Sequence, residues 1–408
     1  MWYNIRVMKI NTLDRAKKLS GKRVLVRADF NVPIKNGKIQ ETYKIEQGLP
    51  TINFLVQAGA KVIIMSHLGR PNGPDKTLSL KPVAKSLEKL FGKKINFFSV
   101  GDKEINGKKL LDKFVDKIKS LPNGSVTLLE NIRFIKGEEK NDSKVAKALA
   151  SLGEIFVLDG FAVAHRDSAS VSGVAKYLPS YAGLLMEKEL SGLSRLTDKP
   201  KRPFAAVIGG AKMETKIPLI KKLLPKVDCI LLGGGIVNTC LWAKGYKVGG
   251  SLIEKKYKKE ALAYLKNRKI IMPVDVVIGD ARGKKVYTAK IDNKFKISDK
   301  NLAIYDIGPE TITRYAKILK NAETLAWNGA LGMFEQSPYH WGSYSIARIF
   351  AARAKGKEFG VAGGGETVEI VKKLKLTEEI DLVSTGGGAM LEFLSGKILP
   401  GVKALAKK

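Results

Sequence analysis

Cysteine is almost absent from this sequence: only Cys229 and Cys240 occur among 408 residues, each within or beside an apolar stretch. So few cysteines argue against a disulfide framework or a zinc site and are typical of a reducing compartment. Residues 1–10 contain neither a continuous apolar core nor a small-residue cleavage site, so we expect no signal peptide. No apolar run approaches the roughly 18 residues of a membrane span. We therefore expect a cytoplasmic protein without membrane contact.

Acidic residues are scarce relative to basic ones, with 39 Asp+Glu against 72 Lys+Arg and a net charge of +33. A balance this basic is found in proteins that bind nucleic acids, because phosphate backbones attract such surfaces. The lysines, however, are scattered through every helix-like segment, and neither an aromatic-interleaved basic motif nor a zinc finger is present. We prefer the interpretation of a solvated lysine-rich surface, which would also draw small anionic metabolites to the protein.

Two common nucleotide-binding signatures are missing, the P-loop and the dinucleotide fingerprint G-x-G-x-x-G with a downstream ribose acid. Four apolar strand candidates instead end in glycine runs, at residues 209–210, 233–235, 363–365 and 386–388. Glycine lets the backbone approach a ligand and exposes the first N–H groups of a following helix, which attract phosphate. Four such runs at one edge of one parallel sheet would indicate a nucleotide or phosphate site.

Apolar strands alternate with helical patterns throughout, which predicts an α/β fold with parallel sheets. The length suits two domains. A helical pattern at residues 181–198 is followed by the basic, proline-flanked break 199–203, and this looks like the boundary. The expected strands are residues 22–30, 61–66, 95–100, 125–130 and 154–159 in the first half, and 204–208, 229–232, 269–278, 302–307, 324–327, 359–362 and 381–384 in the second.

Polar groups collect where the strands of the first half end. They include four arginines and two of the three histidines: Arg27, Asp29, Asn31, His67, Arg70, Arg133, His165 and Arg166. Strand ends in open α/β sheets are where ligands bind, and arginine forks suit carboxylate and phosphate. We therefore expect a basic site for a small, multiply anionic substrate. Nearby arginines would keep the histidines neutral, so we expect them to form hydrogen bonds rather than to transfer protons.

The second half has candidates for phosphate and nucleotide contacts. Lys212 and Lys216 lie four residues apart at a helix start and could share a face, although ordinary surface lysines would show the same spacing. The segments 327–329 and 332–335 could supply an adenine wall and, through Glu335, a ribose-binding carboxylate. Glu366 begins a helix, where it could hold Mg²⁺ or simply cap the helix.

Taken together, the motifs resemble phosphoglycerate kinase. They are RADFNVP (27–33), SHLGRP (66–71), ENIRF (130–134), AHR (164–166), GGAKMETK (209–216), WNG (327–329), GMFE (332–335), GGGET (363–367) and the terminal stretch 384–405. The resemblance implies two doubly wound, mostly parallel three-layer domains that face each other across a cleft and close about a hinge helix. Residues 1–183 would bind 3-phosphoglycerate or 1,3-bisphosphoglycerate, residues 184–390 would bind ATP or ADP with Mg²⁺, and residues 391–408 would return to the first domain.

Carried over to matching positions, the resemblance implies roles for individual residues. The glycerate substrate would be held by Asp29, Asn31, Lys44, His67, Arg70, Arg133 and Arg166. The catalytic groups would be Arg27, Lys44, Lys212 and Gly387. The nucleotide would be bound by Gly209, Lys212, Lys216, Gly233, Asn328, Glu335, Gly364, Glu366 and Thr367, with Glu366 as the metal ligand. The implied activity is reversible phosphoryl transfer in glycolysis and gluconeogenesis, by a monomer.

Two departures from the family pattern bear on activity. Lys44 stands where the family usually has an arginine, so it keeps the charge but lacks the bidentate fork. Glu366 stands where the family usually has a metal-binding aspartate that is one methylene shorter. An alternative is therefore a kinase-fold protein with weakened catalysis whose basic surface binds nucleic acid. A kinase for a related acid is a third, less favoured reading.

Overall fold

The computed structural model describes residues 10–99, 108–355 and 358–406, which form two compact units. One unit contains the described residues up to Ser191 and those from Ile398 onward, and the other runs from Gly192 to Lys397. The stretch 1–9 examined for a signal peptide and Val100, at the end of a predicted strand, lie outside the described residues. Among the described residues, no helix is both long enough and apolar enough to span a bilayer.

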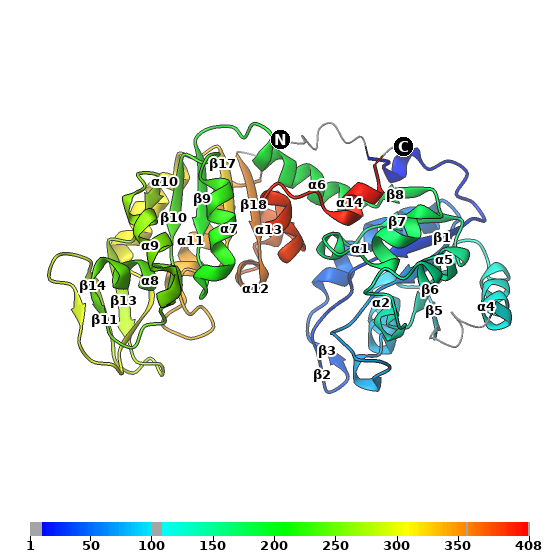
Figure 1. The fold of residues 1–408 in the computed structure, drawn as a ribbon, viewed down its shortest axis with the longest axis horizontal. Helices are drawn as coiled ribbons and strands as arrows, with labels where there is room; N and C mark the ends of the chain where they lie inside the picture. Colours follow the sequence, from blue (N-terminus) through cyan, green and yellow to red (C-terminus); the bar gives the residue numbers. More distant parts are fainter. Residues whose placement is uncertain (1–9, 100–107, 356–357, 407–408) are drawn as a thin grey trace. The chain divides into compact units, whose positions relative to one another are not determined.

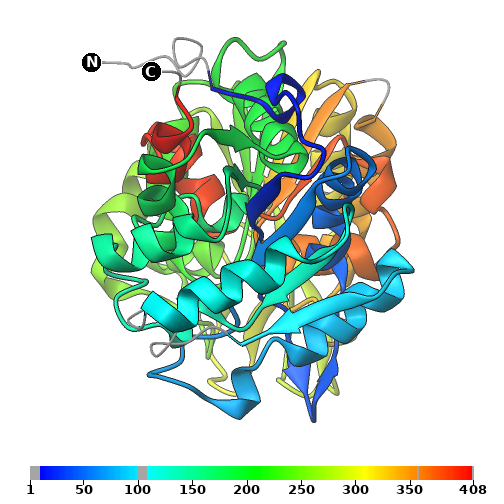
Figure 2. The same cartoon turned by 90° about the vertical axis from the view of Figure 1, so that its right-hand side faces the viewer.

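The first unit is built on a six-stranded parallel sheet with the order β5-β6-β4-β1-β7-β8 (Figures 1 and 2). Its strands are β1 (Arg23–Arg27), β4 (Lys61–Met65), β5 (Ile95–Phe98), β6 (Val126–Leu129), β7 (Ile155–Leu158) and β8 (Ser180–Ala182). The helices are α1 (Tyr43–Gln57), α2 (Lys81–Phe91), α4 (Lys108–Lys119) and α5 (Ser143–Ser151). Short pieces are β2 (Ile34–Lys35), β3 (Lys38–Ile39), η4 (Ile132–Phe134), η5 (Phe161–Val163) and η6 (Ala169–Gly173). Aliphatic residues of β1 and β4 are buried against α1 and α2, as a sheet covered by helices requires.

The second unit has a six-stranded parallel sheet with the order β12-β10-β9-β17-β18-β19. Its strands are β9 (Phe204–Ile208), β10 (Cys229–Leu232), β12 (Ile270–Ile271), β17 (Thr324–Asn328), β18 (Phe359–Gly363) and β19 (Leu382–Ser384). The helices are α7 (Met213–Leu223), α8 (Gly235–Lys244), α9 (Lys258–Lys266), α10 (Pro309–Lys320), α11 (Trp341–Arg353), α12 (Gly365–Lys373) and α13 (Gly388–Leu394). The predicted α/β class with a parallel sheet in each half is confirmed.

Part of the predicted parallel arrangement in the second unit is wrong. The expected strand 269–278 is two strands, β12 and β13 (Asp275–Gly279), because Pro273 interrupts it. A separate three-stranded sheet has the order β14-β13-β16 and is antiparallel, so β16 (Ala303–Ile307) is not in the parallel sheet as expected. We did not predict β14 (Val286–Lys290), because most of its side chains are exposed and give no apolar signal. The two short strands β11 (Lys247–Val248) and β15 (Lys296–Ile297) pair with each other.

The chain passes from one unit to the other within α6 (Leu184–Thr197), between Ser191 and Gly192, whereas our predicted boundary lies at 183/184. The segment that returns to the first unit begins at Ile398 rather than 391. Residues before it belong to the second unit because α13 packs on α7. The returning segment contains α14 (Pro400–Ala404), where the Gly401 N–H donates to the carbonyl of Ala164 at 2.8 Å.

Candidate functional site

The polar cluster expected in the first unit lies at one edge of its sheet. β6, β4, β1 and β7 are neighbours in the sheet and run parallel, so their carboxyl ends share that edge. Chain order reverses between β1 and β7, and such switch points are where ligands bind in open α/β sheets. The side chains that follow these strands are those predicted: Asp29 and Asn31 after β1, His67 and Arg70 after β4, Arg133 in η4, and Arg166 after η5.

Arg27 is the most deeply buried charge of this cluster, with 2% of its surface exposed. Its Nε donates to Oγ of Ser170 at 2.9 Å, and Ser170 donates in turn to Oε1 of Glu138 at 2.6 Å. Burial lowers the pKa of Arg27 to about 10, while Glu138 and Asp29 counteract the shift. Arg27 therefore stays charged at neutral pH, held by a serine and a buried carboxylate. Sequence reasoning missed both partners, because Glu138 stands in an ordinary run of charged residues.

A second group of contacts joins Asp29, Lys44 and His67. Lys44 Nζ donates to Oδ2 of Asp29 at 2.8 Å. Burial alone would raise the pKa of Asp29, but Lys44, His67 and Arg27 outweigh it and hold the pKa below its usual range. Arg27 Nη2 lies 3.3 Å from Nδ1 of His67, and since a guanidinium only donates, Nδ1 must accept. Burial, then Arg27, keeps the pKa of His67 well below 6.5, so the ring is neutral.

The remaining predicted residues of this unit differ in exposure. Asn31 Oδ1 accepts the N–H of Gly69 at 3.0 Å, and Arg133, which is buried, donates to the carbonyl of Gly69. Arg133 and Arg166 share the carboxylate of Glu139, at 3.3 and 3.6 Å. Arg70 is exposed. The cluster thus combines buried guanidinium groups with one that is partly buried, Arg166, and one that is exposed, Arg70. Such an arrangement can bind an anion bearing several negative groups.

In the second unit, all four glycine runs follow strands of one parallel sheet, as predicted. They come directly after or at the ends of β9, β10, β18 and β19, and each leads toward a helix. The backbone is crowded between β9 and β17, where a Cβ on Gly209 would lie 2.0 Å from the Ala330 carbonyl oxygen. A Cβ on Gly233 would meet Leu331 at 2.3 Å. Gly364 and Gly387 are the N-caps of α12 and α13 and have φ of +94° and +48°, which favours glycine.

Lys216 projects from α7 to the end of β17, where it donates to Oδ1 of Asn328. Asn328 donates from Nδ2 to the carbonyl of Gly363 at 2.8 Å, which links the ends of β17 and β18. Burial lowers the pKa of Lys216, and Glu366 partly restores it. Lys212 lies one residue before α7, at its N-cap, and is exposed. Of the two predicted lysines, Lys216 is the one that the structure places against Asn328.

Glu366 and Thr367, in the first turn of α12, bind the loop after β17. Thr367 Oγ1 accepts the N–H of Gly329 at 2.7 Å, and Oε2 of Glu366 accepts the N–H of Ala330 at 3.1 Å. Among the described residues, no group of three or more His, Cys, Asp or Glu is arranged to hold a metal. A metal at Glu366 would therefore need most of its ligands from phosphate oxygens and water, the mode that Mg²⁺ commonly uses with nucleotides.

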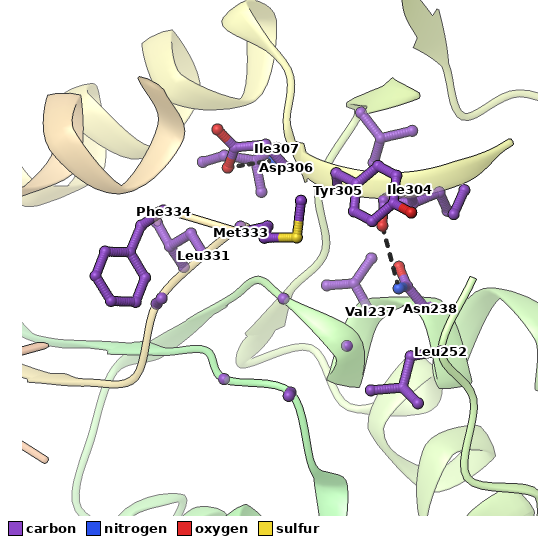
Figure 3. Close-up of a pocket in the computed structure, with 18 of the residues that line it drawn as sticks. Val237, Asn238, Leu252, Ile304, Tyr305, Asp306, Ile307, Leu331, Met333 and Phe334 are labelled. Carbon is purple, nitrogen blue, oxygen red and sulfur yellow. Dashed lines mark hydrogen bonds between the residues drawn. The ribbon is translucent and has the colours of Figure 1, made fainter. Parts of the chain in front are cut away.

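A cavity of about 460 Å³ opens beside these loops in the second unit (Figure 3). Glu335 and Glu366 are the predicted site residues in its wall. Its other walls are largely apolar and come from α8, the loop before α9, β16 and the loop after β17: they include Val237, Asn238, Leu252, Ile304, Tyr305, Leu331, Met333 and Phe334. Residues 332–335 and the glycine runs 209–210 and 233–235 were predicted from the sequence to form the nucleotide site, and members of each line this cavity. The apolar residues of α8 and β16 were not predicted. Trp327, offered as an adenine wall, is instead fully buried and packs near Phe350 in the core.

Comparisons with known proteins match nearly the whole length of the chain. The family profile described as "Phosphoglycerate kinase" matches residues 13–397. A protein of Pelotomaculum thermopropionicum named phosphoglycerate kinase is 44% identical over 398 residues, covering 96% of this chain and 98% of that protein. A second, from Borrelia garinii subsp. bavariensis, is 41% identical over 406 residues, covering 98% and 100%.

The chain belongs to the phosphoglycerate kinase family. The solved structure of the phosphoglycerate kinase from Coxiella burnetii matches with a TM-score of 0.83 at 40% identity, over 98% of this chain and all of that one. The resemblance seen in the sequence motifs is thereby confirmed. Phosphoglycerate kinases are phosphotransferases with a carboxyl group as acceptor, so the chain is an enzyme of this class. The alternative of a kinase-fold protein that binds nucleic acid is not favoured.

Proposed function

We propose that the chain transfers a phosphoryl group reversibly between 1,3-bisphosphoglycerate and ADP, giving 3-phosphoglycerate and ATP, in glycolysis and gluconeogenesis. The observation that carries the proposal is that the two units have sites of different chemical character. The first unit has arginines and a neutral histidine at one sheet edge, and the second has a glycine-lined edge beside a largely apolar cavity. The former suits a small polyanion and the latter a nucleotide.

The glycerate substrate would bind to the predicted residues of the first unit, namely Asp29, Asn31, Lys44, His67, Arg70, Arg133 and Arg166. Buried Arg27, fixed by Ser170, and Lys44, fixed by Asp29, provide positive charge that needs no rearrangement when the substrate arrives. Preorganised charge of this kind stabilises charge that develops on a transferring phosphoryl group. His67, being neutral, would donate a hydrogen bond from Nε2 to the substrate.

The nucleotide would bind in the second unit, with its base and ribose in the cavity beside Glu335 and its phosphates toward Lys216 and Gly210. A Cβ on Gly210 would lie 3.0 Å from Cε of Lys216 and 3.2 Å from Oε2 of Glu366, so these groups converge there. The other predicted contacts are Gly209, Lys212, Gly233, Asn328, Gly364 and Thr367. Gly387, at the start of α13, would present N–H groups to the phosphoryl group in transfer.

The residues present fit one Mg²⁺ bound with the nucleotide. Glu366 would hold it, and the ion would neutralise charge on the phosphate oxygens. The attacking oxygen, on ADP or on the substrate carboxylate, is already ionised, so no general base is needed. The chain's own residues therefore act by positioning and by charge neutralisation. Cys229 and Cys240 are free thiols, which agrees with the cytoplasmic location that we propose for a monomer.

A coupled assay tests the proposal by measuring ADP released from ATP in the presence of 3-phosphoglycerate and Mg²⁺. We expect turnover that requires all three components and that is lost when Mg²⁺ is chelated. ATP consumption that is independent of 3-phosphoglycerate would contradict the proposed acceptor. If both substrates bind but no turnover is seen, the proposed activity is wrong. The site would then bind its substrates without catalysing transfer, and Lys44 and Glu366 would be the substitutions that explain the loss.

A further inference from the structure

A chain of hydrogen bonds in the first unit starts at Glu138 and ends at the imidazole ring of His67. Oε1 of Glu138 accepts from the Ser170 hydroxyl at 2.6 Å, and Oγ of Ser170 accepts from Nε of Arg27 at 2.9 Å. At the other end, Nη2 of Arg27 lies 3.3 Å from Nδ1 of His67. None of the four residues has more than 4% of its surface exposed, so solvent competes little with these bonds.

The surroundings of Ser170 decide the direction of its hydrogen bonds. Its hydroxyl lies between a guanidinium group, which can only donate, and a carboxylate, which accepts. The single hydroxyl proton of Ser170 therefore goes to Glu138, and a lone pair faces Arg27. Oε1 of Glu138 also accepts from Ser168 at 2.9 Å, and the main-chain carbonyl of Glu138 accepts the N–H of Ala169 at 2.9 Å. The segment that carries Ser170 is thus fixed to Glu138 through both main chain and side chains.

The bond to Ser170 orients the whole guanidinium group of Arg27. A guanidinium is planar, so its five N–H bonds have fixed directions relative to one another. The bond from Nε to Ser170 therefore also sets the direction in which Nη2 donates. The third nitrogen, Nη1, donates to the carbonyl of Ala28, the next residue in the chain. Without the Ser170 hydroxyl, Nε would lose its acceptor and the group could turn away from His67.

The imidazole of His67 has two potential partners at Nδ1, and they require opposite protonation. Nη2 of Arg27, at 3.3 Å, requires Nδ1 to be an unprotonated acceptor. Oδ1 of Asp29, at 3.8 Å, would require a proton on Nδ1, and this distance is too long for a hydrogen bond. The contact with Arg27 is therefore the one that forms, and in a neutral ring the proton is then on Nε2.

We propose that Ser170 is a positioning residue of the substrate site: it holds Arg27 against Nδ1 of His67 and thereby keeps the imidazole proton on Nε2. An Nε2–H group donates to a carboxylate or phosphate oxygen, whereas the other tautomer would present a lone pair to that oxygen. The link to an anionic substrate rests on the proposed function. A hydrogen bond to a charged group is worth about tenfold in affinity or more.

Nitrogen-15 NMR of the histidine side chains tests the proposal in the protein without substrate, because protonated and unprotonated ring nitrogens give well-separated signals. The chain has only three histidines, and His67→Gln assigns the signals of His67. Ser170→Ala is compared with Ser172→Ala, a buried serine of the same η6 segment whose hydroxyl donates to Asp167 instead. We expect a proton on Nε2 in the wild type and in Ser172→Ala. In Ser170→Ala, the proton should move to Nδ1 in part or all of the molecules.

Steady-state kinetics separates this role from a merely structural one. Ser170→Ala should raise the KM for 3-phosphoglycerate about tenfold and leave the KM for ATP within about twofold. Ser172→Ala should change neither KM. A general loss of folded enzyme would lower the rate with both substrates and leave both KM values unchanged.

A proton on Nδ1 of His67 in the wild type overturns the inference, and this measurement stands even if Ser170→Ala does not fold. An unchanged tautomer in folded Ser170→Ala overturns it as well, as does a changed tautomer with an unchanged KM for 3-phosphoglycerate. If the wild type shows no turnover with 3-phosphoglycerate, the proposed function fails and the link to the substrate falls with it. The NMR result still decides whether Ser170 controls the tautomer, so the two failures are distinguishable.

Discussion

The ammonium group of Lys44 lies 2.8 Å from Oδ2 of Asp29, while Oδ1 of the same carboxylate accepts the N–H of Asn31 at 3.1 Å. One carboxylate therefore ties the start of α1 to the turn after β1. Lys44 is held in place although its side chain is partly exposed. The family usually has an arginine here, and the structure shows that the lysine occupies a defined position rather than a free one.

We expect Lys44→Met to lower kcat about a hundredfold, the usual cost of removing one preorganised group from a phosphoryl or oxyanion site. Lys44→Arg should restore the wild-type rate or exceed it, because a guanidinium binds phosphate oxygens in pairs. Steady-state kinetics with both substrates measures the effect. A Lys44→Met enzyme with wild-type kcat would remove Lys44 from the catalytic groups.

Glu138→Gln is expected to destabilise the protein by about 2 kcal/mol or more, because Glu138 is the carboxylate that most strongly compensates the charge of buried Arg27. Glu139→Gln is the matched control: it is the adjacent residue with the same chemistry, but its side chain is 50% exposed. The control should change stability by about 0.5 kcal/mol or less. Urea unfolding followed by circular dichroism compares the two. Equal effects would mean that Arg27 does not depend on Glu138.

Two glycine substitutions separate folding from function. Gly209→Ala should cost about 1–3 kcal/mol of stability, since its Cβ would lie 2.0 Å from the carbonyl oxygen of Ala330. At Gly388, the first residue of α13, an added Cβ meets no atom of the described residues within 4 Å. Gly388→Ala should therefore fold with unchanged or slightly higher stability.

The same Gly388→Ala variant should lose kcat/KM, because its methyl group occupies the space where a phosphoryl group would approach the helix N-terminus. Thermal unfolding gives the stability of the variant, and the coupled assay on the same preparation gives its kcat/KM. Full activity together with full stability would place the transferring group away from α13.

Stability should fall as the pH rises through about 7 because of Asp159. Burial raises the pKa of this group from 3.8 to about 7, although Oδ1 accepts from Thr51 and from the N–H of Leu185. The folded protein holds a proton there that the unfolded chain has released, so the stabilisation is complete below the ordinary pKa and is lost above 7. Linkage gives a loss of about 1.4 kcal/mol between about pH 6 and pH 9.

Asp159→Asn keeps the size of the side chain and an acceptor for both contacts, and it does not ionise. We expect it to reduce the slope of the free energy of unfolding against pH over this range. The slope that remains comes from buried Asp306, whose pKa burial raises to about 8. Asp116→Asn, at an exposed position on α4, should leave the slope unchanged. An unchanged slope in Asp159→Asn would show that the carboxyl group stays ionised in the fold.

The sequence was enough to predict that the polar residues after the strands lie close together. Parallel strands bring their carboxyl ends to one edge of the sheet, and this does not depend on how the helices pack. That rule placed Asp29, His67 and Arg133 together, and it placed the four glycine runs on one sheet. It said nothing about buried support such as Glu138, whose partner Ser170 lies far away in the chain.

The apolar walls of the cavity could not be predicted from the sequence, for a different reason. Asn238, Leu252 and Tyr305 converge only because β13 turns out of the parallel sheet and pairs with β16. Within its own segment, the local sequence pattern marks each of these residues only as an ordinary core or surface residue. Trp327 shows the converse, since an aromatic beside a site motif proved to be a core residue.

The central claim is that each unit binds one substrate through its own residues, and paired calorimetric titrations test it most directly. 3-Phosphoglycerate and ADP with Mg²⁺ are each titrated into the wild type, Arg166→Met and Lys216→Met. Arg166→Met should lose about tenfold or more in affinity for 3-phosphoglycerate and bind ADP normally, and Lys216→Met should show the reverse. If either variant affects both ligands equally, or affects only the ligand assigned to the other unit, the account is contradicted.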